Sequence, residues 1–382
     1  MRDRDVPYRI GFFSNHATVV GGGEISFIDL VDSIRRYGVT PRVFVPGKGE
    51  VFDRLCARNL HPCIYALPPI RLSTLPRLFY AFIMMIVIIV RNKLQIVHVN
   101  GARCMLLVGA ASLVCRIPIV WHVRVMERDR HLDRIRAALA SAIIANSKAV
   151  AQTIKPFCND SLHIHVVYNG IDSSRFTSVA PIDMQREFSA PSSLPIVLAV
   201  GRLCAWKRFH VLIEACGILK NTAPAFTCLI IGRDAEDETH YTQDLHTMPK
   251  RLGLDNVIFG DWRTDVPSIM KSATLLALPS HYEPFGRVII EAWACGLPVI
   301  ATDAGGPAEI IEHGKTGMLI PIDDATALAR EIGRLLTDEN LRDFLSSNGR
   351  ARVNDFSLDA HARNIAAVYP TIPRFRRTDT HA

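Results

Sequence analysis

The chain of 382 residues is too long for one small domain, so two domains are the first expectation. About half of its residues are hydrophobic and about a fifth are charged, which is typical of a globular enzyme and excludes a disordered or fibrous chain. The net charge of +7 fits anionic partners such as nucleotides or anionic lipid, although it also fits no particular partner. The nine cysteines form no CxxC pair or zinc-type cluster, which predicts reduced thiols in the cytosol.

Strand-like and helix-like patterns alternate along the chain, which predicts α/β architecture with parallel sheets. The short apolar run at residues 10–13 is soon interrupted, so no signal peptide is expected. In the first half, helices are expected at 24–37 and 147–155, and strands at 8–13, 41–45, 96–100, 117–122, 142–145 and 163–167.

An unbroken apolar run covers residues 78–90, between Arg77 and Arg91. A helix that spans a bilayer needs about 20 apolar residues, and this run is shorter. Two interpretations stay open. The run is a buried helix of the first domain, or it dips into a membrane surface with the help of the flanking arginines and Arg71.

Between residues 173 and 195 Pro, Ser and Ala become common and the periodicity fades, which predicts an inter-domain linker. A second alternating series follows. Its expected strands are 196–200, 227–231, 256–259, 274–277, 298–301 and 318–320, and its expected helices are 209–219, 241–252, 287–295 and 325–336, with one more at 358–369. The expected domains are therefore 1–175 and 190–352, followed by a C-terminal helix and basic tail at 353–382.

Two polar motifs follow strands of the first series, at the edge where open α/β sheets bind ligands. Gly22 and Gly23 open a helix, and their backbone could approach a phosphate or sugar closely, or simply form a tight turn. His122 ends a strand and could donate to a sugar hydroxyl, transfer a proton or be structural. The dinucleotide GxGxxG fingerprint and the Walker A motif are absent, which argues against a dehydrogenase.

A basic motif, Gly201-Arg202 followed by Lys207, comes after the first strand of the second series. Two cations beside a nucleotide diphosphate would stabilise it as a leaving group, because negative charge builds up there in the transition state. The alternative is a solvated basic loop.

Of two carboxylates, Glu283 is expected in a turn that opens a helix, and Glu291 is expected inside that helix. The start of a helix binds anions through its free N–H groups and its dipole. A carboxylate further along the helix can accept hydrogen bonds from sugar hydroxyls. This segment therefore predicts a site for a ligand that carries both phosphate and ribose.

In combination these residues resemble a retaining glycosyltransferase of family 4, the GT-B type, in which two Rossmann-like doubly wound domains face a central cleft. The resemblance runs from Gly21 to about Leu336. Its specific motifs are Gly201-Arg202 with Lys207, Glu283 with Glu291, the segment 296–302, and Gly305-Gly306 with Glu309.

The resemblance implies roles for the second-domain residues. Arg202 and Lys207 would hold the donor diphosphate, and Glu291 would bind the ribose hydroxyls. Glu283 would lie beside the donor sugar. The backbone amides near phosphate and sugar would be those of Phe285, Gly286 and Arg287.

In the first domain the resemblance implies that Gly22 and Gly23 approach the donor and that His122 lies near the reacting sugar. Val123 and Arg124 follow His122 where many members carry Asp. Similarly, Arg208 follows Lys207 where Gly is usual. No role is carried over to these departures.

The implied chemistry is sugar transfer from a nucleotide-diphosphate sugar with retention at the anomeric carbon, without a metal or cofactor. The acceptor would be a saccharide or a lipid-linked molecule of cell-surface polysaccharide or glycolipid synthesis, and nucleic acid is not an expected partner. The expected location is the cytoplasm, at the inner face of the membrane if an anionic surface binds the apolar run. Two alternatives stay open: a nucleotide-sugar epimerase or hydrolase on the same fold, and a non-catalytic nucleotide-sugar-binding protein.

Overall fold

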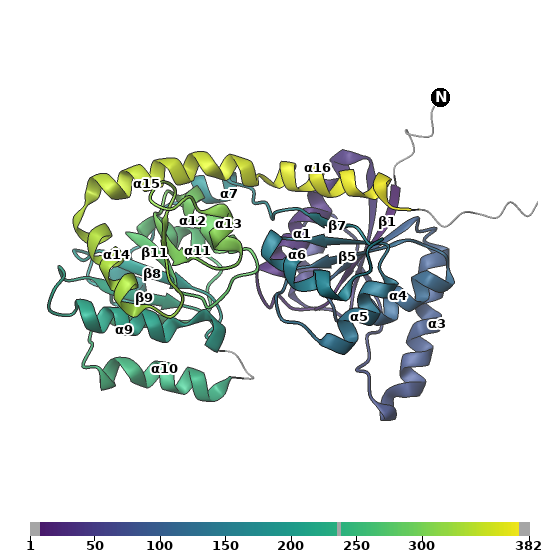
Figure 1. The fold of residues 1–382 in the computed structure, drawn as a ribbon, viewed down its shortest axis with the longest axis horizontal. Helices are drawn as coiled ribbons and strands as arrows, with labels where there is room; N and C mark the ends of the chain where they lie inside the picture. Colours follow the sequence, from purple (N-terminus) through teal and green to yellow (C-terminus); the bar gives the residue numbers. More distant parts are fainter. Residues whose placement is uncertain (1–7, 235–237, 374–382) are drawn as a thin grey trace, which may run out of the picture. The chain divides into compact units, whose positions relative to one another are not determined.

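The computed structural model describes residues 8–234 and 238–373. Two compact units divide them. One runs to Gly170 and takes up the chain again from Leu358, and the other is Ile171–Ser357. Each unit contains one parallel sheet with helices packed on it (Figure 1). The expected pair of Rossmann-like α/β domains is confirmed.

The first sheet has seven parallel strands in the order β3-β2-β1-β4-β5-β6-β7, so the strand order reverses beside β1. Side chains alternate between its faces. Phe12 packs into a core cluster with α1 and α16, and Phe13 packs into another with α3 and α4. The strands are β1 (Tyr8–Ser14), β2 (Val39–Val45), β3 (Cys63–Ile64), β4 (Ile96–Asn100), β5 (Ile119–Val123), β6 (Ala142–Ala145) and β7 (Ile164–Val166).

Most strands of this sheet lie within two residues of the expected positions, but β3 was not expected. It has only two residues and both are exposed, so it shows no hydrophobic pattern. The helices of the unit are α1 (Gly22–Ser33), α2 (Glu50–Cys56), α3 (Leu75–Arg91), α4 (Met105–Val114), α5 (Arg130–Leu139), α6 (Lys148–Ile154) and α16 (Leu358–Val368).

The C-terminal helix α16 belongs to the core of the first unit, beside α1 (Figure 1). It buries Ala362, Ile365 and Val368, and Tyr369 after it is also buried. An amphipathic pattern does not say which sheet a helix covers, so residues 353–382 could not be assigned to either domain from the sequence. The basic tail from residue 374 lies outside the described residues.

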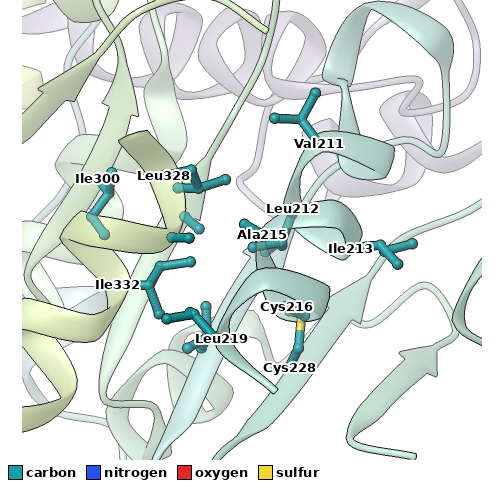
Figure 2. Close-up of a cluster of buried hydrophobic side chains, with 14 of the residues drawn as sticks. Val211, Leu212, Ile213, Ala215, Cys216, Leu219, Cys228, Ile300, Leu328 and Ile332 are labelled. Carbon is teal, nitrogen blue, oxygen red and sulfur yellow. The ribbon is translucent and has the colours of Figure 1, made fainter. Parts of the chain in front are cut away.

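The second sheet has six parallel strands in the order β10-β9-β8-β11-β12-β13. Helices α9 and α14 cover one face, where Leu212, Ile300 and Leu328 meet and Cys216 faces Cys228 (Figure 2). The strands are β8 (Ile196–Val200), β9 (Thr227–Ile231), β10 (Val257–Gly260), β11 (Leu275–Leu278), β12 (Val299–Thr302) and β13 (Met318–Ile320). The helices are α9 (Phe209–Leu219), α10 (Thr239–Arg251), α11 (Val266–Ser272), α12 (Arg287–Cys295), α13 (Gly306–Ile310), α14 (Ala325–Thr337) and α15 (Glu339–Arg352).

The segment expected as a linker is part of the second unit, which begins at Ile171. It forms two short helices, α7 (Ser174–Thr177) and α8 (Met184–Phe188). Phe176 and Met184 are buried, so each helix is anchored by one apolar side chain. Helices this short carry too few apolar residues to show a helical repeat in the sequence, so the pattern of the segment resembled that of a linker.

Helix α3 contains the apolar run and is buried along one narrow stripe only. Ala81, Met85 and Ile89 are buried, and Met85 and Ile89 pack into the core cluster that contains Phe13, whereas Phe79 is 68% exposed and Tyr80 is 64% exposed. With the 3-10 turn before it, the helix covers Leu72–Arg91, which is long and apolar enough to cross a membrane by length and composition alone. The interpretation as a buried helix therefore holds for one face and fails for the rest.

Replacing Ile365 with Ala tests whether α16 belongs to the core cluster that contains Phe12 and α1. The substitution leaves a cavity among buried side chains, so we expect unfolding to become easier by about 2–5 kcal/mol, measured by urea denaturation. Asn364→Ala, an exposed neighbour on the same helix, should change stability by less than about 0.5 kcal/mol. Equal effects of the two changes would mean that α16 is not part of this core.

Candidate functional site

A buried ion pair between Lys207 and Glu283 lies at the carboxyl edge of the second sheet. Lys207 ends a 3-10 turn, Ala205–Lys207, in the loop after β8, and Glu283 lies in the loop after β11. Ser280 Oγ donates to Glu283 Oε1 at 3.0 Å. Breaking a buried pair by removing one partner typically costs 3–5 kcal/mol, because the other charge is left without compensation. The two predicted site residues thus hold each other in place.

Two glycines after β12 allow the Glu283 loop to adopt this position. Gly306 N donates to Glu283 O at 2.8 Å. A Cβ atom on Gly305 would lie 2.4 Å from Glu283 O, and one on Gly306 would lie 2.4 Å from Phe285 O. Both distances are closer than backbone atoms can approach, so side chains at these positions would displace the loop.

An aromatic stack joins the loops that carry the ion pair. The rings of Trp206 and Tyr282 are 5.5 Å apart and nearly parallel, and His281 N donates to Trp206 O at 2.8 Å. Lys207 Nζ also lies 4.5 Å from the centre of the Trp206 ring. Sequence reasoning did not single out this stack or Ser280. Their only signal was proximity, since each is a direct neighbour or a near neighbour of a predicted site residue.

Helix α12 begins directly after the Glu283 loop. Its N-cap, Gly286, has φ of +83°, a left-handed conformation that favours glycine. Arg287 is the first residue of the helix, and its Nε donates to Oε1 of Glu291, one turn further along, at 2.7 Å. The carboxylate predicted to bind ribose is therefore oriented by the side chain of the residue whose amide was predicted to lie near the phosphate.

Of the two cations in the predicted basic motif, only Lys207 is buried in the site. The Lys207 side chain lies against the backbone of Gly201, where an added Cβ would be 3.1 Å from Lys207 Cε. Arg202, one residue further, is exposed. The structure therefore combines one buried and paired cation with one cation in solvent.

The departure at Arg208 has a structural consequence. Arg208 has φ of +55°, in the left-handed region that favours glycine, so its backbone is strained relative to a glycine. Its side chain lies against Asp323, with Nε and Oδ1 2.9 Å apart. This surface ion pair offsets part of the strain.

In the first unit, Arg124 gathers the ends of several strands. It follows β5 and donates to Asn100 at the end of β4 and to Asn169 after β7. A Cβ on Gly23 would lie 3.8 Å from Arg124 Cδ, so the guanidinium stem runs beside the start of α1. Arg124, which stands where many family members carry Asp, is thus a buried organiser of the same sheet edge.

His122 is buried on the face of β5 that α1 and α16 cover. Its Nδ1 lies 3.1 Å from His98 Nε2 and 3.4 Å from Arg124 Nη2. Burial and the adjacent Arg124 charge hold the pKa of His122 well below its ordinary value, so the ring is neutral at physiological pH. These surroundings disfavour proton uptake by His122, and therefore the proton-transfer role that was one of the possibilities predicted from the sequence.

Among residues 8–234 and 238–373, no three His, Cys, Asp or Glu side chains come together in an arrangement that could hold a metal ion.

Two family models cover most of the chain. Residues 182–352 match Glycosyl transferases group 1, and residues 20–175 match Glycosyltransferase Family 4. The chain belongs to these glycosyltransferases. The family predicted from the motifs is thereby confirmed.

Curated proteins that are similar to this chain have several names. The D-inositol 3-phosphate glycosyltransferase of Salinispora tropica is 31% identical over 246 residues, which are 61% of this chain and 51% of the relative. The lipopolysaccharide core biosynthesis glycosyltransferase LpsE of Rhizobium meliloti is 30% identical over 220 residues, which are 57% of this chain and 61% of the relative. The matches thus span about half to three-fifths of the length of these relatives.

Solved structures resemble the chain over nearly its full length. Anabaena HepE, solved in complex with UDP and glucose, has a TM-score of 0.84 and 26% identity, covering 95% of this chain and all of HepE. HepE was also solved with UDP-glucose. A glycosyltransferase from Rickettsia africae has a TM-score of 0.83 at 23% identity, covering 96% of this chain and 98% of its own, and it supports the fold alone.

Acidification should destabilise the first unit of the protein through His98. Burial lowers the pKa of His98 from 6.5 to about 3. Between these pH values the unfolded chain binds a proton at His98 and the folded chain does not. The contribution of neutral, buried His98 to folding stability is therefore fully present above pH 6.5 and is lost as the pH falls towards 3. Between pH 7.5 and 5.0 this one group should cost about 2 kcal/mol.

The measurement is urea denaturation at both pH values. His98→Gln should remove about that much of the pH dependence, and His61→Gln, at an exposed site, should remove none. An unchanged pH dependence in His98→Gln would contradict the assignment.

Proposed function

We propose that this protein transfers a sugar from a nucleotide-diphosphate sugar to an acceptor hydroxyl with retention at the anomeric carbon. The observation that carries the proposal is the buried Lys207–Glu283 pair at the carboxyl edge of a parallel sheet. It combines a cation suited to a phosphate with a carboxylate suited to sugar hydroxyls. The complexes of HepE with UDP and UDP-glucose support this class of donor.

The second unit would supply the donor contacts. Lys207 and the exposed Arg202 would bind the diphosphate, Glu291 would accept hydrogen bonds from the ribose, and Glu283 would lie against the sugar. The backbone amides at the start of α12 would complete the phosphate site. In the first unit, Gly22, Gly23 and His122 keep the roles that the family resemblance gives them.

The proposed mechanism uses these positions without a metal or cofactor. As the sugar–phosphate bond breaks, negative charge grows on the departing diphosphate, where Lys207 and Arg202 would offset it. The acceptor hydroxyl would attack from the face that the diphosphate leaves, and its proton would pass to the departing phosphate oxygen. Bond formation on that face gives retention.

The acceptor would be a saccharide or a lipid-linked molecule of cell-surface polysaccharide or glycolipid synthesis. The name of LpsE, a glycosyltransferase of lipopolysaccharide core biosynthesis, supports a role of this kind. A panel of UDP, GDP, ADP and their sugars, read by melting temperature, would identify the donor, because a ligand that binds the native state raises it. Turnover of the donor without any acceptor, giving an epimer or free sugar, would favour the epimerase or hydrolase alternative.

Glutamine substitutions should separate the two carboxylates. Glu291→Gln should weaken nucleotide binding at least about tenfold, because it removes a charged acceptor from the ribose hydroxyls. Glu283→Gln should leave the nucleotide Kd nearly unchanged and lower kcat, because its partner would be the sugar. Titration calorimetry and steady-state kinetics measure these effects, with Glu339→Gln on the exposed part of α15 as the control. Comparable losses of nucleotide affinity in both variants would contradict this division of roles.

We also propose that the protein works in the cytoplasm, on the anionic inner face of the cell membrane, through the exposed face of α3. Phe79, Tyr80 and Ile83 are exposed on this helix, whose opposite face packs on the core. From residue 54 to residue 126 the chain has no Asp or Glu, while Arg71, Arg77, Arg91 and Lys93 flank the apolar run 78–90 of the helix. Because one stripe of α3 is packed on the core, the helix would lie in the plane of the interface.

Flotation with liposomes tests this surface. The wild-type protein should float with vesicles that contain anionic lipid, and less so at high salt, because salt screens the arginines. Phe79→Ser with Tyr80→Ser should reduce binding tenfold or more, since each large apolar side chain contributes about 1.5–3 kcal/mol on burial. Phe344→Ser, at an exposed phenylalanine of α15, is the matched control. No flotation of the wild type at low salt, or equal loss in the control, would refute the proposal.

A further inference from the structure

A pocket of about 550 Å³ lies in the first unit, between the segment that follows β3 and the start of α3. Its volume is in the range of pockets that bind small molecules. It is lined by Ala66, Leu67, Pro68, Pro76, Arg77 and Tyr80. None of these six residues is buried, so the pocket opens on the surface of the first unit.

Hydrogen bonds hold the two walls of this pocket together. Thr74, which comes just before α3, lies with its Oγ1 2.5 Å from Pro69 O, and Arg71 N donates to Thr74 Oγ1 at 3.1 Å. Pro68 and Pro76, one in each wall, have φ angles that their rings fix. The pocket is therefore largely formed before a ligand arrives, which lowers the entropy cost of binding.

The pocket lies at the carboxyl edge of the first sheet. Tyr65 comes directly after β3, and its buried hydroxyl donates to the carbonyl of Ser14, the last residue of β1, at 2.7 Å. Helix α3 connects β3 to β4 in a parallel sheet, so it runs back along the strands and begins at this same edge. Figure 1 shows the start of α3 extending past α4 and α5. Open α/β sheets bind ligands at the carboxyl edge.

The lining of the pocket combines one cation with an apolar surface. Arg77 is exposed, and among residues 8–234 and 238–373 no carboxylate forms an ion pair with it. Leu72 and Leu75, which lie between the two walls in the sequence, are 88% and 50% exposed. A guanidinium binds phosphate strongly, and burial of hydrocarbon is favourable. A ligand that carries a phosphate at the end of an apolar chain therefore matches both features.

We propose that the pocket binds a lipid-linked acceptor at the place where a phosphate joins the saccharide to the apolar chain. Arg77 binds the phosphate, and the chain lies against Leu67 and the ring of Tyr80. The position at the carboxyl edge favours an acceptor over an ordinary membrane lipid, which needs only the exposed face of α3. The role of the pocket rests on the proposed function, whose acceptor it narrows to lipid-linked saccharides.

Titration calorimetry with dodecyl phosphate, kept below its micelle concentration, tests the pocket. The wild type should bind this compound at least about tenfold more tightly than butyl phosphate, because the longer chain buries more apolar surface. Arg77→Gln should weaken binding about tenfold or more, because a charge-assisted contact is lost. Arg91→Gln, at an exposed arginine at the other end of α3, is the matched control. No binding to the wild type, or an equal loss in Arg91→Gln, would overturn the proposal.

A second variant tests the shape of the pocket. Ala66→Phe places a ring in the pocket and should also weaken dodecyl phosphate about tenfold or more, whereas Ala138→Phe, at an exposed site of α5, should not. Urea denaturation of both variants checks that they remain folded. Unchanged affinity in Ala66→Phe would show that the compound binds elsewhere, and the proposal would fail.

Liposome flotation separates an acceptor from an ordinary membrane lipid. With vesicles that contain anionic phospholipid, Ala66→Phe should float to the same extent as the wild type, because the exposed face of α3 is unchanged. Loss of flotation in this variant alone would assign the pocket to membrane phospholipid and contradict the proposal.

The calorimetry with dodecyl phosphate needs neither donor nor turnover. If the protein binds no nucleotide sugar, the proposed function fails, and the calorimetry still shows whether the pocket binds a lipid phosphate. If nucleotides bind and dodecyl phosphate does not, the lipid-linked acceptor alone is refuted.

Discussion

The buried ion pair between Lys207 and Glu283 is the interaction on which the second unit's candidate site depends. A charge taken out of water is costly unless a partner offsets it, so each side chain fixes the position of the other. Three loops come together around the pair. They follow the adjacent strands β8, β11 and β12, and the last of them contributes Gly305 and Gly306, whose missing side chains make room for the Glu283 backbone.

Much of this arrangement could be predicted from the sequence. Strands alternate with helices, so the sheets had to be parallel, and motifs that follow strands had to gather at the carboxyl edges. Glu283, Glu291 and Lys207 were found on this basis. Their pairings could not be found, because residues 76 positions apart meet only when the loop conformations are known. The partners Ser280 and Trp206 were missed for the same reason.

The first unit shows where sequence patterns are insufficient. The period of α16 predicts a helix with an apolar stripe, but only the tertiary structure places that stripe against α1 and brings Tyr369 to His98. His122 was expected as a lone histidine at a strand end, and it instead lies within hydrogen-bond distance of two other buried side chains, His98 and Arg124. For α3 the composition could not decide between core and surface, because the helix is apolar all round and the core covers one stripe only.

Titration calorimetry of the wild type and Lys207→Met tests the central claim most directly, with the nucleoside diphosphate and monophosphate of whichever base binds. If Lys207 contacts the diphosphate, the diphosphate should bind the wild type more tightly than the monophosphate does. Lys207→Met should then weaken the diphosphate about tenfold or more and bring it close to the monophosphate, because a charge-assisted contact is lost. Equal affinity of the variant and the wild type for the diphosphate would contradict the account.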